Sequence, residues 1–360
     1  MSNQYYKFNE KMQIKDPLRV FFLCGSAFTK NDPNDKRNVL KSYIESLNIN
    51  YKVIILEEHF VFGKMRSGYL SYDHIFMKNL KDIELLTGLF SDKIIILHES
   101  ISTAAELGMF SSNKDLFKKT CILTPDYFAV EEEKVSNFIR LAFLNSRTPE
   151  ESVKRITYYP KTNKNIVSNV RTEYHTYFPQ NKIKGNLALN INSFIMKDYK
   201  EVFEITFKKQ KFSKAYTDDS IISYNYNKSE LNLNFPIKII RILLVTIFSL
   251  DEFRVKIRSS IAIKDAVSAL EDEFKSILKN TLSEIEATDF KNHKLIIGIK
   301  DNNIPFRNVI GYFLYTLQAI GMVKLPSDKS KKFIISPIFK ILYDNNLIKQ
   351  IKPSKFTGLL

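Results

Sequence analysis

The sequence predicts an α/β protein that begins with a doubly wound parallel sheet and continues into a small β-rich insert and a helical, winged-helix-like region. Three observations lead to this fold class. Between residues 19 and 159, short apolar runs alternate with stretches of helical periodicity. From about residue 161 the periodicity changes from 3.6 to 2. Basic residues exceed acidic ones by 14 after residue 150, but by only 1 before it. We therefore expect three segments: 1–160, 161–235 and 236–360.

Five apolar runs predict the strands of the parallel sheet. The first, Arg19–Cys24, is uninterrupted and ends at Gly25, a pattern typical of a central parallel strand. The others lie at Lys52–Leu56, Ile94–Leu97, Thr120–Leu123 and Ile156–Tyr159. Helices are expected between them at Asp35–Leu47, at Asp73–Phe90, from Ala104 onward and from about residue 130 to 144. Ligands of such sheets bind outside the carboxyl ends of the strands.

The segment Ile94–Phe110 carries the most specific chemical signal. A buried strand is followed by a polar turn, His98–Thr103, and then by a helix that opens on Ala104. This spacing places Glu106 in the first helical turn, where the helix dipole favours its ionised form. A carboxylate there can attack, or electrostatically stabilise, the anomeric carbon of a bound sugar. The same residues also fit a capping box in which Glu106 only folds back onto Thr103, and the spacing leaves both interpretations open.

Alternating apolar residues predict three short, half-buried strands in the second segment, forming a small antiparallel platform. The alternating positions are Leu187, Leu189 and Ile191, then Phe203, Ile205 and Phe207, then Leu231, Leu233 and Phe235. Past Pro236 the pattern is helical again, at Ile237–Leu250 and Ile263–Leu278. The most apolar run, Ile239–Leu250, contains Arg241 and is too short to span a bilayer, so we expect a buried helix and no membrane contact.

The last segment has the element order of a winged helix. An amphipathic helix is expected at Phe306–Ile320, followed by a strand–turn–strand over residues 322–335 and a closing helix at Pro337–Asn345. Basic side chains on the wing and its flanks are the expected phosphate contacts of such a domain. They are Arg307, Lys324, Lys329, Lys331 and Lys332. A packing or dimerisation domain with solvated lysines is the alternative.

The amino-acid composition narrows the classes of function and location that the protein can have. The formal charge of +15, carried almost wholly after residue 150, suggests a near-neutral catalytic part joined to a part that meets a polyanion. The two cysteines, Cys24 and Cys121, lie in expected buried strands, which favours a reduced, cytoplasmic protein. The amino terminus lacks the apolar core of a signal peptide. No Cys/His cluster has metal-ligand spacing, so we expect neither a metal nor a cofactor.

A set of residues around the first and third strands carries a resemblance to a known family. The set comprises Phe22–Gly25, Leu80, Glu84, Asp92–Leu97, Glu99–Ser100, Glu106–Gly108 and Phe110–Ser111. Over residues 18–145 the chain resembles nucleoside deoxyribosyltransferase-like proteins, specifically the effector (toxin) proteins of bacterial retrons. Residues 290–345 loosely resemble the winged-helix-like tail of those effectors, and residues 185–235 have no counterpart.

The resemblance implies cleavage or transfer at an N-glycosidic bond. Glu106 matches the family's nucleophile in the transferases and the essential acid in the toxins. The implied partners are a nucleotide substrate, a reverse transcriptase and its msDNA, an RNA–DNA hybrid; the last two hold the toxin in check. The resemblance further implies that phage infection releases the toxin, which then depletes a nucleotide pool and arrests the cell. The subunit number is open, with a homo-oligomer or a filament among the expectations.

The turn before Glu106 departs from the family pattern. His98 and Ile101 replace prolines, and Ser102–Thr103 replace Gly-Ser. Ser100 stands where the transferases carry an acidic partner, and Glu99 is the adjacent candidate for that role. Adenine or guanine needs protonation to leave, whereas nicotinamide is already cationic in its dinucleotide. We therefore hypothesise that NAD, or a similarly activated nucleotide, is the substrate.

Further residues complete the expected site. Asp73 and Tyr72 open the second helix and are expected to contact the ribose, and Gly25–Ser26 to hold phosphate where the first strand ends. Hydrogen bonds to sugar or phosphate are expected from Ser100, Ser102 and Thr103. Two other functions remain open. One is a nucleic-acid-binding regulator whose α/β domain senses a nucleotide without catalysis, and the other is a phosphoribohydrolase- or TIR-like hydrolase of a different defence operon.

Overall fold

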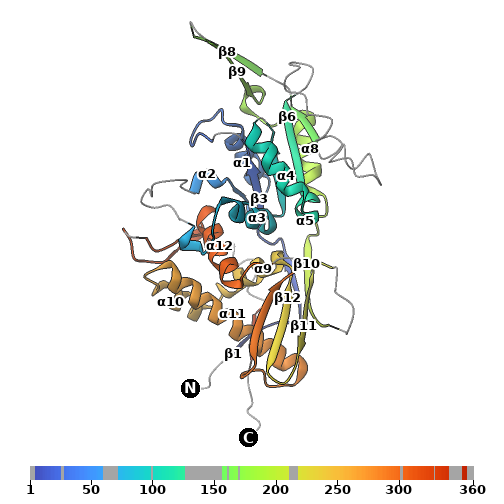
Figure 1. Ribbon diagram of the computed structural model, residues 1–360, viewed down its shortest axis with the longest axis vertical. Helices are drawn as coiled ribbons and strands as arrows, with labels where there is room; N and C mark the ends of the chain where they lie inside the picture. The colour runs from blue at the N-terminus through green and yellow to red at the C-terminus, as the bar shows by residue number, and fades with distance from the viewer. Residues whose placement is uncertain are drawn as a thin grey trace. The chain divides into compact units, whose positions relative to one another are not determined.

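The computed structural model describes residues 5–25, 28–59, 72–98, 100–125, 156–159, 162–168, 171–210, 218–300, 303–327, 329–339 and 351–354. Its contacts divide the chain into two compact units, and Figure 1 labels many of their elements. The parallel-sheet unit comprises residues 19–59 and 87–199. The mixed-sheet unit comprises residues 1–18, 60–86 and 200–360. The units therefore interleave along the chain, whereas the three expected segments are consecutive.

The parallel-sheet unit is built on a five-stranded sheet in the order β4-β3-β5-β6-β7, with every neighbouring pair parallel. In chain order within this unit the sequence of strands is 2-1-3-4-5, the order of flavodoxin-like doubly wound sheets. The predicted parallel α/β sheet is confirmed, together with its five strands. These are β3 (Arg19–Cys24), β4 (Tyr51–Ile54), β5 (Lys93–Leu97), β6 (Thr120–Pro125) and β7 (Ile156–Tyr159).

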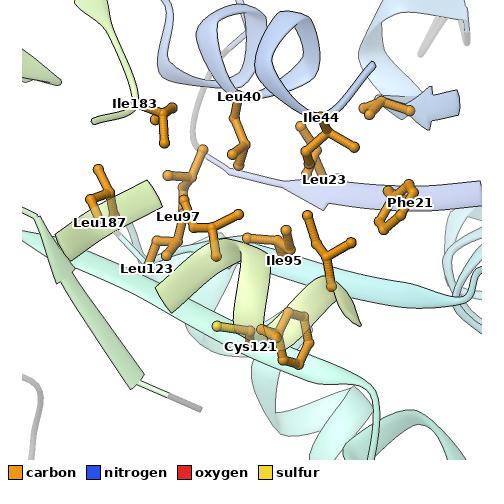
Figure 2. Close-up of a cluster of buried hydrophobic side chains, with 14 of the residues drawn as sticks. Phe21, Leu23, Leu40, Ile44, Ile95, Leu97, Cys121, Leu123, Ile183 and Leu187 are labelled. Carbon is orange, nitrogen blue, oxygen red and sulfur yellow. The ribbon is translucent and has the colours of Figure 1, made fainter. Parts of the chain in front are cut away.

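One face of this sheet is covered by α1 (Lys36–Leu47) and α8 (Gly185–Met196). Figure 2 shows Leu40 and Ile44 of α1, and Leu187 of α8, beside side chains of the strands. Alternate strand positions supply the opposing side chains because successive residues of a strand point to opposite faces. They are Phe21, Leu23, Ile95, Leu97, Cys121 and Leu123, all buried. Cys24 is buried as well, as expected for both cysteines.

The opposite face is covered by α4 (Ile101–Ser111), α5 (Lys114–Phe117) and the end of α3 (Leu80–Phe90), of which residues 87–90 belong to this unit. Phe22 of β3 contacts Phe110 of α4 edge to face, with ring centroids 6.0 Å apart. Gly88 allows α3 to approach closely, since a Cβ there would lie only 3.0 Å from Cδ2 of Leu116. Helices thus cover both faces, which explains why the strands are uniformly apolar rather than alternating.

Residues 187–191 are helical, and the prediction of a strand there is wrong. In α8 the buried side chains are Leu187, Ile191, Phe194 and Ile195, at positions i, i+4, i+7 and i+8 of one helical face. Leu189, which completed the apparent alternation, is 66% exposed. The segment carries both periodicities, and the helical one is selected because it buries four side chains against the sheet.

The predicted single helix over Asp73–Phe90 is also wrong. A short 3₁₀ turn, η1 (Asp73–Ile75), ends at Phe76, whose φ of 60° is left-handed and stops the helix. The chain re-enters a helix at α3, where the Asn79 side chain accepts a hydrogen bond from the backbone N–H of Asp82 at 2.9 Å. Asn79 therefore acts as an N-terminal cap that separates the two elements.

The mixed-sheet unit holds a second five-stranded sheet, in the order β13-β12-β11-β10-β2. The strands predicted around residues 203–207 and 231–235 are confirmed, but the expected antiparallel arrangement is wrong, because β10–β11 and β12–β13 are parallel pairs. Three helices lie between β12 and β13 in the chain and supply the crossover that a parallel pair needs. The strands are β2 (Lys11–Lys15), β10 (Val202–Lys209), β11 (Ile221–Tyr226), β12 (Glu230–Phe235) and β13 (Lys294–Ile299).

The helices of this unit gather around α11, and the predicted helices from residue 237 to 320 are confirmed. An aromatic cluster forms the core: Phe274 of α11 contacts Phe8, Phe235 and Phe306 at centroid distances of 6.2, 5.9 and 5.1 Å. Every residue from Ile239 to Ile247 is buried, as expected for the most apolar run. The helices are α9 (Ile237–Ile247), α10 (Asp251–Arg258), α11 (Ile263–Glu286) and α12 (Phe306–Ala319).

The remaining described elements are short. Two antiparallel pairs lie outside the large sheets, β1 (Tyr5–Phe8) with β16 (Ile351–Ser354), and β8 (Thr162–Ser168) with β9 (Arg171–Tyr177). The helix expected at about residues 130–144 lies outside the described residues. The short helices are α2 (Leu56–His59) and η3 (Pro179–Asn181).

Candidate ligand-binding edge of the parallel sheet

Three neighbouring strands end at the same edge of the parallel sheet, β4 at Ile54, β3 at Cys24 and β5 at Leu97. The chain leaves the central strand β3 for β4 on one side and then returns to β5 on the other. This is the point at which the strand order reverses, where doubly wound sheets bind their ligands. With neighbouring strands about 4.8 Å apart, the ends of β4 and β5 lie about 10 Å from each other. The residues that follow these strands form the candidate ligand-binding edge of the sheet.

Helix α4 begins at this edge three residues earlier than predicted. Ser100 is its N-cap, and the Ser100 hydroxyl accepts a hydrogen bond from the backbone N–H of Thr103 at 3.3 Å. In return the Thr103 hydroxyl accepts from the backbone N–H of Ser100 at 3.0 Å, which completes a capping box. The Thr103 side chain is buried, and Ser102 is exposed in the first helical turn with its hydroxyl 2.8 Å from that of Ser100.

Glu106 therefore does not cap the helix, and its predicted place in the first turn is wrong. It is the sixth residue of α4, in the second turn, where the helix dipole contributes little. The buried residues of α4 are Thr103, Leu107 and Phe110, at positions i, i+4 and i+7 of the stripe that faces the sheet. Glu106 occupies the i+3 position of that same stripe and is half-buried, with its Oε2 atom fully buried. A carboxylate thus takes a place in the helix face where packing alone would select an apolar residue.

Sequence reasoning missed an ion pair with a buried arginine at the same edge. Arg37, in the first turn of α1, has a side chain only 2% exposed and donates from Nη1 to Oε1 of Glu57 at 2.7 Å. Glu57 follows β4 and is 37% exposed. The Arg37 guanidinium also lies 5.0 Å from the centroid of the Phe28 ring. The available signal was a pair of acids, Glu57 and Glu58, directly after the second strand.

Gly25 lies at the edge as expected, but the structure gives it another reason to be glycine. A Cβ at this position would come within 3.0 Å of Cδ and 3.1 Å of Nε of Arg37. The missing side chain therefore makes room for the arginine to pass over the end of β3. Ser26 and Glu99 lie outside the described residues. The backbone N–H of His98 donates a hydrogen bond to the carbonyl of Leu123 at 2.9 Å, which extends the pairing of β5 with β6 by one residue.

Asp73 and Tyr72 belong to the mixed-sheet unit, whereas Glu106 belongs to the parallel-sheet unit. They are therefore not among the residues that the described sheet edge brings together. Asp73 begins η1, which packs against α12. Burial, together with the negative charge of Glu84, raises the pKa of Tyr72 above its ordinary value of 10.0.

The expected basic surface is partly formed. Strands β14 (Val323–Lys324) and β15 (Ile334–Ile335) pair antiparallel, which confirms the predicted strand–turn–strand. Residues 337–339 are helical, and the rest of the expected closing helix lies outside the described residues. Four of the predicted phosphate contacts are exposed, namely Lys324, Lys329, Lys331 and Lys332. Arg307 instead takes part in internal packing: it is ion-paired with Glu271 at 3.1 Å and lies over the ring of Phe76.

Two properties of the described residues bear on the class of site. No group of three or more His, Cys, Asp or Glu side chains there could hold a metal ion. Among the helices described, none is both long enough and apolar enough to cross a membrane.

The fold and the sheet edge define an α/β protein with a doubly wound sheet, an acid at the strand-order reversal and an exposed lysine-bearing hairpin in its second unit. Residues 33–351 match the family described as STM3845 retron effector protein. Because this match covers most of the 360 residues, the chain belongs to that family of retron effectors.

The chain is also similar to an Escherichia coli protein named "Retron Ec73 putative ribosyltransferase/DNA-binding protein". The two are 32% identical over 136 residues, which is 37% of this chain and 41% of that relative. The match thus spans less than half of the relative's length.

Proposed function

We propose that this protein is the toxin of a retron antiphage defence system and cleaves the N-glycosidic bond of a nucleotide through Glu106. On this proposal the parallel-sheet unit is a nucleoside deoxyribosyltransferase-like domain. Membership of a retron effector family supports the defence role. The name of the E. coli relative includes a ribosyltransferase, which is also a glycosyl-transfer activity. The single observation that carries the assignment is a half-buried carboxylate in the sheet-facing stripe of α4, beside the strand-order reversal.

The proposed role of Glu106 is to stabilise the positive charge that develops on the sugar during bond cleavage. Breaking the bond between a ribose and its base builds positive charge on the sugar ring, and a fixed carboxylate close to C1′ stabilises that charge. Glu106 is placed on an ordered helix whose cap and buried stripe fix its backbone. Since Glu106 lies in the second turn, the helix dipole contributes little to stabilising its charge.

The residues of the turn before α4 favour one kind of leaving group. Ser100 replaces the acid of the transferases, and its hydroxyl is engaged in capping α4. A substrate whose base leaves without protonation suits such a site, and the nicotinamide of NAD is already cationic. We therefore propose NAD, or a similarly activated nucleotide, as the substrate that is depleted to cause abortive infection.

Control of the toxin is assigned to the retron's own products. The reverse transcriptase and its msDNA would hold the protein inactive in the cytoplasm until infection. The exposed lysines of the hairpin, Lys324, Lys329, Lys331 and Lys332, are the proposed contacts to the msDNA phosphates, within a winged-helix-like domain.

The test is base release from a panel of nucleotides by purified wild-type protein and by Glu106→Gln. We expect the wild type to release nicotinamide from NAD, and the variant to be slower by about a hundredfold or more. Glu58→Gln, at the same sheet edge, is the matched control and should keep its activity. Release of adenine without any release of nicotinamide would overturn the substrate assignment.

A second candidate is a nucleic-acid-binding regulator that senses a nucleotide without cleaving it. It is favoured by the exposed hairpin lysines and by the DNA-binding part of the relative's name. Toxicity and DNA binding of Glu106→Gln separate the two functions. Loss of toxicity with DNA binding intact supports the enzyme, whereas toxicity that survives the substitution supports the regulator.

A further inference from the structure

We infer that Glu57, held in place by the buried Arg37, accepts a hydrogen bond from the 2′-hydroxyl of the substrate's adenosine ribose, so that the site selects ribonucleotides over 2′-deoxyribonucleotides. This inference rests on the proposed nucleotide-cleaving function and names the sugar that the site takes. In these roles Glu57 determines specificity and Arg37 is a positioning residue.

The position of Glu57 is the first observation. It follows β4, while α4 and Glu106 follow β5, and β3 lies between those two strands. The two acids therefore flank the end of the central strand at the strand-order reversal. In doubly wound sheets that bind dinucleotides, an acid of this kind accepts the hydrogen bond of a ribose 2′-hydroxyl.

The ion pair with Arg37 is the second observation. The guanidinium is almost completely buried, whereas the carboxylate of Glu57 is 37% exposed, so the pair presents its acidic member to solvent. Burying an arginine is costly, and such a pair is weak evidence for a purely stabilising role. The arginine does fix the direction of the carboxylate, and Gly25 leaves the space that the arginine requires.

The acceptor capacity of Glu57 is the third observation. Arg37 engages Oε1, and a carboxylate accepts through both of its oxygens. Oε2 can therefore take a hydroxyl hydrogen while Oε1 remains bound to Arg37. The neighbouring Glu58 differs, because it is ion-paired with Lys41 at 2.7 Å and only 16% exposed. Glu58 is thus the natural control for Glu57.

The expected selectivity follows from this bond. A site built to accept a substrate hydroxyl binds the analogue without it less well, and a bond to a charged acceptor gives about tenfold discrimination or more. A 2′-phosphate in place of the hydroxyl brings a second negative charge towards Glu57 and is rejected for that reason. The site should therefore prefer ATP to dATP and NAD to NADP.

The experiment measures initial rates of nicotinamide release from NAD and NADP, and affinities for ATP and dATP, for wild type, Glu57→Gln and Glu58→Gln. In Glu57→Gln the single amide oxygen stays with Arg37, which leaves an amino group where Oε2 stood. This change preserves shape, and thermal melting verifies that the variant is folded. We expect a preference of about tenfold or more in wild type and in Glu58→Gln, falling to about threefold or less in Glu57→Gln.

Equal rates on NAD and NADP or equal affinities for ATP and dATP in wild type, or a preference unchanged in Glu57→Gln, would overturn the inference. Calorimetric binding of ATP and dATP to the Glu106→Gln protein separates it from the proposed function. If no base is released but ATP binds more tightly than dATP, and only while Glu57 is intact, the proposed cleavage fails and the sugar assignment stands. Equal affinity for both nucleotides, or binding of neither, overturns the sugar assignment.

Discussion

At the scale of single residues, the start of α4 decides what Glu106 can do. The sequence offers two capping groups three residues apart, Ser100 and Thr103, and each is followed by residues that could open a helix. Prediction from spacing selected Thr103, whereas the structure uses Ser100 and turns Thr103 into the second half of the capping box. The shift moves Glu106 from a capping position into the sheet-facing stripe, so capping does not explain the acid there.

Removing the cap tests this assignment. Ser100→Ala should lower the free energy of unfolding by about 1 kcal/mol, because the N–H of Thr103 loses its acceptor at the helix start. The exposed Ser102 provides the comparison, and Ser102→Ala should stay within about 0.5 kcal/mol of wild type. Denaturant unfolding measures both. A larger loss for Ser102→Ala than for Ser100→Ala would mean that α4 is capped differently.

At the scale of elements, continuous apolar strands were predictable and segments with two periodicities were not. All five strands of the parallel sheet were expected from runs such as Arg19–Cys24. A strand that is buried on both faces is a continuous apolar run, which is easy to recognise in the sequence. In residues 185–196 the spacing fits both a strand and a helix, and the choice depends on the sheet face that the segment covers. That face is a tertiary property, which a local pattern does not contain. For the same reason the Arg37–Glu57 pair, 20 residues apart, was not visible as a pair.

A pair of substitutions in α8 distinguishes the helix from the expected strand. In a strand, Leu189 and Ile191 would share one face, so their truncations would have similar costs. In the helix only Ile191 is buried, at 1% exposure against 66% for Leu189. Ile191→Ala should cost about 2–5 kcal/mol and Leu189→Ala less than about 0.5 kcal/mol by chemical unfolding. Comparable losses would contradict the helical assignment.

At the scale of the whole molecule, the mixed-sheet unit joins its sheet to α11 through a polar network around Glu286. Oε1 of Glu286 accepts from the hydroxyl of Tyr224 at 2.6 Å. Oε2 accepts from Tyr226 at 2.6 Å and from Lys209 at 2.7 Å. Burial acts to raise the pKa of Glu286, but these three hydrogen bonds outweigh it and hold the pKa below its ordinary value of 4.5. The network is therefore intact when Glu286 is ionised.

The consequence is a specific acid sensitivity. Because folding lowers the pKa of Glu286, the network adds stability above the pKa of the unfolded chain, and this stability is lost as the pH falls through the folded-state pKa. Glu286→Gln should remove this part of the pH dependence, so that the difference in stability between wild type and variant shrinks as the pH falls from about 5 through the folded-state pKa of Glu286. Chemical unfolding at a series of pH values measures it. A constant difference across that range would contradict the account.

The uneven charge of the chain predicts that DNA binds at the exposed hairpin lysines. Nearly all of the excess positive charge lies after residue 150, and the hairpin lysines are exposed. Changing Lys329, Lys331 and Lys332 to Gln should make the slope of log affinity for DNA against log salt shallower by about 2–3, because each phosphate contact contributes about 0.7–0.9. The same change in net charge at Lys114, Lys118 and Lys184, exposed in the other unit, should leave the slope nearly unaltered. Equal effects of the two triple variants would mean that the hairpin is not the contact.

The central claim is that Glu106 supports cleavage of a nucleotide's glycosidic bond, and single-turnover nicotinamide release from NAD tests it most directly. Wild type, Glu106→Gln and the exposed control Asp115→Asn are compared at saturating enzyme, where the rate reports the chemical step. We predict release by wild type and by Asp115→Asn at the same rate, with Glu106→Gln slower by about a hundredfold or more. Release by Glu106→Gln at the wild-type rate would contradict the account.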